Sequence, residues 1–208
     1  MKLRYMPVII CSLCCSAQTA SAFPGLPGII DVGIHGGGKS GSNVNQVVVD
    51  CSIALDLYLD AQVLLIQAIA GKEELAARQA TIDFVQKGDA KKASNEEKAK
   101  MGREMDESLN RIVQENRPLD EHQKRLATEG ALRYVLAVSR TSKLAGSVSN
   151  IDVKAIGIFD APGVLYLINN LPAVVTNSIS TTGKIFKYLS SNNVDIAKAQ
   201  KAADGLGV

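Results

Sequence analysis

The chain has 208 residues, with 23 Lys and Arg against 21 Asp and Glu, and 46% of its residues are hydrophobic. This apolar content is high enough for a globular core and argues against intrinsic disorder. The near balance of charge excludes the basic footprint of a nucleic-acid-binding protein or of a protein drawn to an anionic membrane surface.

Residues 1–22 are predicted to be a secretory signal peptide that is removed from the mature protein. Lys2 and Arg4 form a positive first region, residues 6–17 an apolar core, and Ala20-Ser21-Ala22 a cleavage site of the A-x-A type. We therefore expect export, with the periplasm as the leading compartment and the outer surface or the extracellular medium as alternatives. Removal of this segment leaves 21 basic and 21 acidic residues, so the mature chain is expected to be neutral.

Residues 23–43 are rich in glycine and proline and are predicted to form a flexible arm. Within this arm, residues 33–40 match G-x-x-x-x-G-K-[ST], the pattern of a P-loop that holds nucleotide phosphates. A P-loop follows a strand of a parallel sheet and opens a helix, but no alternation of strands and helices is predicted here. We interpret the match as accidental and expect a non-enzymatic protein without a cofactor.

Residues 44–208 are predicted to form one all-α domain, a bundle of about five to six helices. Residues 44–70 predict a long helix that is apolar nearly all round, as is typical of a central helix. Charged helices with an apolar stripe are predicted over 72–86, from 94 to the break at Pro118, and over 119–144. The second of these begins with Ser94-Asn95-Glu96-Glu97, which has the S-x-x-E form of a capping box.

After Gly146 the chain is poor in charge and rich in helix breakers, and residues 161–183 carry no charge at all. We expect Gly157, Pro162, Gly163 and Pro172 to cut this carboxy-terminal part into short, broken helices. A last pair of helices is predicted near 182–190 and 194–203.

Three aspartates, Asp50, Asp56 and Asp60, lie on the first long helix, and no basic residue occurs between Lys39 and Lys72. Asp56 and Asp60 are four residues apart and share a face, so a divalent cation or acid–base chemistry is one interpretation. The favoured interpretation is that they mark a wet edge, or that they pair with Lys and Arg from the charged helices. No metal site is predicted.

Cys51 is the only cysteine outside the signal peptide, so no disulfide can form within the mature chain. As a nucleophile it would need His35 or His122 as its base, but its position in the apolar pattern favours an inert, buried thiol. Met101 and Met105 lie on a helix stripe, where methionine fills core more often than it forms an adaptable binding surface.

Residues 151–189 contain many apolar side chains between the helix breakers. Their ordinary role is to close the core, but such a segment can also wall an apolar cavity or form a docking surface. The residues predicted for a possible apolar ligand or docking surface are Phe159, Leu165, Tyr166, Leu167, Ile168, Leu171, Val174 and Val175.

For function, we expect an exported accessory, adaptor or assembly factor that contacts another protein or a second copy of itself. The first alternative is a carrier of an apolar ligand such as a lipid, held between the first long helix and residues 151–189. The second alternative is a membrane-inserting helical protein that uses residues 161–183. No nucleic-acid partner is expected.

Overall fold

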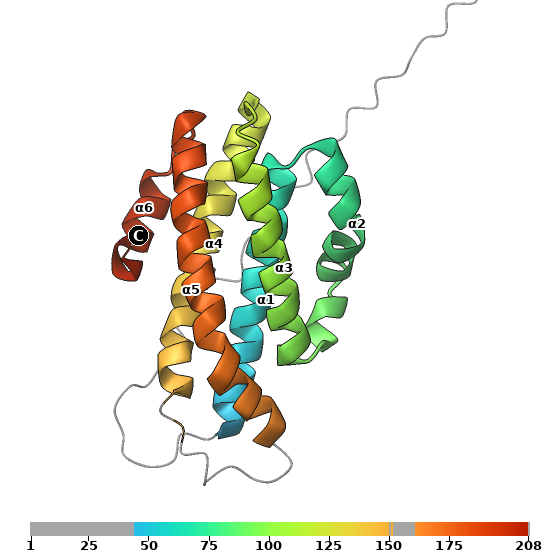
Figure 1. The fold of residues 1–208 in the computed structure, drawn as a ribbon, viewed down its shortest axis with the longest axis vertical. Helices are drawn as coiled ribbons and strands as arrows, with labels where there is room; N and C mark the ends of the chain where they lie inside the picture. The colour runs from blue at the N-terminus through green and yellow to red at the C-terminus, as the bar shows by residue number, and fades with distance from the viewer. Residues whose placement is uncertain (1–43, 150, 152–160, 208) are drawn as a thin grey trace, which may run out of the picture. The chain divides into compact units, whose positions relative to one another are not determined.

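The computed structural model describes residues 44–149, 151 and 161–207. These residues form six α-helices and no strand, which confirms the predicted all-α class (Figure 1). The predicted signal peptide and the glycine-rich arm with its P-loop match lie outside the described residues. The elements are α1 (Val44–Ile69), α2 (Lys72–Gln86), η1 (Asp89–Lys92), α3 (Asn95–Gln114), α4 (Glu121–Val148), α5 (Ala161–Ser191), α6 (Ala197–Ala203) and η3 (Asp204–Leu206), where η marks a short 3-10 helix.

Four helices, α1, α3, α4 and α5, form the core of the bundle (Figure 1). Helix α1 packs against α3 and α4, and α5 packs against the same two helices. Helices α1 and α5 therefore occupy opposite corners, with α3 and α4 at the other two. Helix α6 packs against α4, and α2 packs against α1 and η1. The apolar side chains of these helices form a single buried cluster, as the predicted helical periodicity requires.

The helix starts follow from local capping. Ser94 caps α3, because its hydroxyl accepts from the Glu97 amide at 3.2 Å and its own amide donates to the Glu97 carboxylate at 2.8 Å, which confirms the predicted capping box. Helix α4 starts with a second box, in which Asp120 and Gln123 exchange the corresponding bonds. Between α2 and η1 the chain turns at Gly88, whose φ of 79° is in the region that glycine adopts without strain.

The prediction of short, broken helices across residues 161–191 is wrong, because these 31 residues form the single helix α5. Pro172 lies inside this helix at an exposed position. Proline has no backbone N–H, so one helix carbonyl loses its hydrogen bond, and at an exposed position that carbonyl lies near solvent. The hydroxyl groups of Ser178 and Thr182 donate to the carbonyls four residues earlier, at 2.7 and 2.8 Å. These polar side chains are therefore satisfied by carbonyl groups of the helix itself.

Candidate functional site

A buried carboxylate lies where the four core helices meet. Asp106 of α3 is only 3% exposed, although most other charged residues of this helix lie at the surface. Its Oδ1 accepts from Gln62 Nε2 of α1 at 2.8 Å and from Tyr134 Oη of α4 at 2.7 Å. Its Oδ2 accepts from Tyr58 Oη of α1 at 2.5 Å and faces Ser178 Oγ of α5 at 3.0 Å. One or more side chains from each of the other three core helices thus reach this single residue.

The surroundings of Asp106 are tightly packed. The rings of Tyr58 and Tyr134 lie with centroids 5.8 Å apart, and the Tyr58 hydroxyl also contacts the hydroxyl of Ser178. Gly102, one turn before Asp106, leaves room for the Tyr58 ring, since a Cβ there would lie 2.8 Å from Tyr58 Cε1. Its carbonyl accepts the second Gln62 N–H at 2.7 Å.

No cation of the described residues pairs with the Asp106 carboxylate. Burial raises the pKa of Asp106, and the hydrogen bonds from Tyr134, Tyr58, Gln62 and Ser178 offset only part of that effect. Burial also raises the pKa values of Tyr58 and Tyr134 well above 10, so both phenols stay protonated and serve as donors. At this site, uncharged hydrogen-bond donors surround one buried carboxyl group.

A polar pocket of about 250 Å³ opens between α3 and α5, on the surface side of Asp106. Asn110 Nδ2 donates to Thr181 Oγ1 at 3.0 Å across it, but the buried Asn110 Oδ1 has no hydrogen-bond partner within the described structure. The lining residues are Arg103, Asp106, Glu107, Asn110, Asn177, Ser180, Thr181 and Lys184. Both signs of charge are therefore present in one small concave site.

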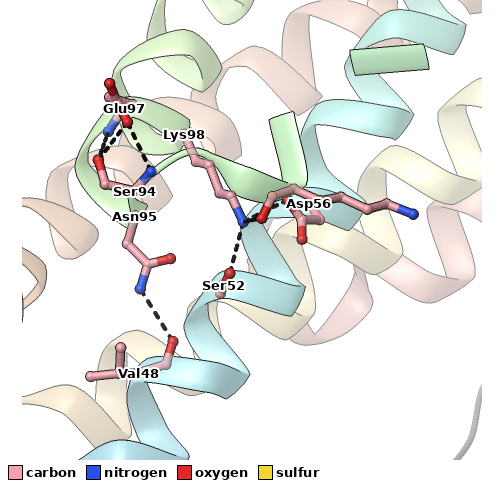
Figure 2. Close-up of polar contacts among 8 residues, drawn as sticks. Val48, Ser52, Asp56, Ser94, Asn95, Glu97 and Lys98 are labelled. Atoms are coloured by element: carbon pink, nitrogen blue, oxygen red, sulfur yellow. Dashed lines mark hydrogen bonds and ion pairs between the residues drawn. The ribbon is translucent and has the colours of Figure 1, made fainter. Parts of the chain in front are cut away.

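A buried ion pair joins α1 to α3 (Figure 2). Lys98 is fully buried, and its Nζ lies 2.9 Å from Asp56 Oδ1 and 2.7 Å from Ser52 Oγ. The Asp56 side chain is 20% exposed, so one end of the pair reaches solvent. Asp56 therefore pairs with a lysine of a charged helix, as the favoured interpretation of the aspartates expected.

The other acidic and nucleophilic candidates remain separate from one another. Asp60 is exposed, and its pKa is raised by partial burial and by the charge of Asp56. Across residues 44–149, 151 and 161–207, no group of three or more His, Cys, Asp or Glu is placed to hold a metal ion. Cys51 is buried, as its apolar position predicted, and burial raises its pKa to about 12, which disfavours the thiolate. His122 is exposed on α4, and His35 lies outside the described residues.

Helix α1 also carries an apolar stripe that no other described segment covers. Val49, Ile53 and Leu57 follow one another at intervals of four residues and are 50%, 42% and 36% exposed. The apolar sequence of α1 predicted a central helix, and α1 packs against both α3 and α4, but these three positions stay exposed. In the following turns of α1, Ala61, Leu65 and Ile69 are buried, so the stripe occupies the first half of the helix.

The described residues predicted for an apolar ligand or docking surface lie on α5 and differ in exposure. Leu167, Leu171, Val174 and Val175 are buried in the core, whereas Leu165 is 38% exposed and Tyr166 and Ile168 are partly exposed. Phe159 lies outside the described residues. Met105 is buried and Met101 half-buried, so both pack with the core. Among the described helices, none is both long and apolar enough to cross a membrane.

Sequence reasoning did not identify Asp106 or Ser178. One signal was present: Gln62 is the only amide in the apolar series of residues 51–66, and a polar residue at a core position needs a buried partner. Asp106 itself gave no signal, because it is one of many charged residues between 95 and 115. Comparison of the chain with models of known families, with curated proteins and with solved structures finds no match.

Proposed function

We propose that this chain is an exported, non-enzymatic helical protein that acts through contacts with another protein, and that Val49, Ile53 and Leu57 of α1 form the contact surface. The observation that carries the proposal is the exposure of these three residues on one helix face. Single exposed apolar residues are common, but three in line on one face form the kind of stripe that packs against another helix. The expected export rests on the predicted signal peptide.

The charge around this stripe indicates the chemistry of the partner. Helix α1 contains three aspartates and no basic residue. Asp56 is paired with Lys98, whereas Asp50 and the exposed Asp60 lie beside the stripe. An amphipathic helix with an apolar face and a flanking Lys or Arg would complement both the shape and the charge of this surface.

A photo-crosslinking amino acid placed at position 53 tests the proposal in cells of the source organism. The matched control is position 165, because Leu165 has similar exposure but stands outside the stripe. We expect position 53, but not position 165, to crosslink to one defined protein, and an Ile53→Asp variant to lose that protein from the purified complex. Labelling from both positions alike, or from neither, would contradict the proposed surface.

Native mass spectrometry of residues 23–208 separates this proposal from its alternatives. A complex with the crosslinked protein supports it. A homodimer that dissociates in the Ile53→Asp variant would assign the stripe to self-association instead. Additional mass in the range of a lipid would favour the carrier of an apolar ligand.

A further inference from the structure

The polar pocket between α3 and α5 is independent of the α1 stripe, and its lining has charges and hydrogen-bonding groups that the fold leaves unused. Glu107 and Lys184 make no ion pair or hydrogen bond with any other described residue. The one bond of the Arg103 guanidinium, to Tyr166 Oη, is long at 3.4 Å. Asn110 Oδ1 is buried and lacks a donor among the described residues, which costs free energy.

These groups are ordered along the pocket. Helices α3 and α5 run in the same direction here, because Asp106 contacts Ser178 and, one turn later, Asn110 contacts Thr181. Arg103 lies one turn before Glu107 on α3, and Lys184 lies about one turn after Thr181 on α5. The pocket therefore presents a cation towards each end, with the carboxyl groups of Asp106 and Glu107 between them.

We infer that this pocket binds a small amino acid that carries two carboxylates. One carboxylate lies at Arg103 and the other at Lys184, as charge-assisted hydrogen bonds require. The ammonium group of the ligand lies between them, where it donates to the exposed carboxylate of Glu107. The pocket of about 250 Å³ is smaller than typical ligand sites of about 300–1,000 Å³, so it suits a free amino acid better than a peptide or a nucleotide.

Calorimetric titration and thermal unfolding of the mature protein with L-glutamate and L-aspartate test this inference. Binding should appear as heat of association and as a rise in Tm that grows with ligand concentration. Glutarate lacks the ammonium group and L-glutamine lacks the second carboxylate, so each should bind about tenfold more weakly or worse. Sodium chloride at matched ionic strength controls for general salt effects.

Two variants locate the binding in the pocket. Glu107→Gln and Lys184→Gln change exposed residues that line it, and each should weaken glutamate or aspartate binding by about tenfold or more. Glu104→Gln and Lys187→Gln are matched controls, because they remove the same charges from exposed positions of the same helices outside the lining. The controls should bind as the unmodified protein does.

Three outcomes would overturn the inference. They are an absence of binding by both acidic amino acids at millimolar concentration, equal binding of glutarate or glutamine, and stabilisation that persists unchanged in the Glu107→Gln and Lys184→Gln variants. The last outcome would identify a general solute effect rather than a site.

Discussion

The charge state of Asp106 depends on two opposing effects, burial without a cation and hydrogen bonding to four side chains. Burial is the larger effect and raises the pKa above 3.8. Between that value and the raised pKa, the folded protein holds a proton that the unfolded chain has released. The free energy of unfolding therefore loses a contribution from Asp106 as the pH rises through this interval.

An Asp106→Asn variant measures this effect. Its amide N–H group faces hydrogen-bond donors, so at acidic pH we expect it to be less stable than the wild type by about 1–3 kcal/mol. The difference should be largest at low pH and shrink as the pH rises, because only the wild type has the titrating carboxyl. Urea unfolding of both proteins from acidic to neutral pH gives the difference directly.

Asp83→Asn is a control, because the pKa of Asp83 is shifted in the opposite direction to that of Asp106. Hydrogen bonds from Gln79 and Lys87 lower the pKa of Asp83, so any stability that it contributes is lost as the pH falls. The difference between wild type and this variant should shrink towards low pH. An advantage of Asp106 over Asn that increases with pH would show that the hydrogen bonds outweigh burial.

Lys98 is the second buried residue for which we predict a change in the free energy of unfolding. Lys98→Met should lower the free energy of unfolding by about 3 kcal/mol, because it leaves the partly buried Asp56 without its cation. Arg133→Met removes an exposed pair with Glu129 and should cost less than about 1 kcal/mol. Denaturant unfolding at neutral pH compares them. A Lys98→Met/Asp56→Leu double variant should recover much of the loss, and equal effects of the two single variants would contradict a special role for the buried pair.

At the scale of the helix, two glycines on α3 and α4 illustrate opposite constraints. An added Cβ at Gly102 would lie 2.8 Å from the Tyr58 ring, which its bonds to Asp106 and Ser178 hold in place. An added Cβ at Gly146 would meet no heavy atom within 4 Å. The same substitution is therefore expected to have opposite signs at the two positions.

Gly102→Ala should destabilise the protein by about 1–3 kcal/mol through overpacking, whereas Gly146→Ala should stabilise it by up to about 1 kcal/mol through helix propensity. Thermal or urea unfolding of the two variants, compared at one temperature, checks both values. A neutral Gly102→Ala variant would mean that the Tyr58 ring can shift without losing its bonds.

The boundaries of individual helices could be predicted where the signals are local. The bounds of α2 and the capping box at Ser94 follow from charge, apolar spacing and a short capping motif. Helix α5 could not be predicted in this way, because Pro172 normally indicates a break and only its exposed position in the folded chain makes it tolerable. Propensity acts within a few residues, whereas exposure depends on the complete bundle.

At the scale of the molecule, the all-α class followed from the sequence, but the neighbours of each helix did not. The partners of Asp106 lie 28 to 72 residues away along the chain, and no spacing rule connects such distances. The many charged residues of α3 also gave no sign that its single aspartate, Asp106, is buried in the core. The apolar content of α1 predicted a central helix, and the exposed stripe became visible only once its neighbours were known.

Because side chains from α1, α4 and α5 contact Asp106 of α3, the buried site can form only after all four helices have been synthesised. Residues from α1, α3 and α4 are synthesised first, and Ser178 follows only on α5, the last of the four. A ribosome-bound or truncated chain that ends before residue 161 lacks α5, the helix that contacts Asp106 Oδ2 through Ser178. Such a chain is expected to remain open to proteases, with cooperative protection arising in one step when α5 is added.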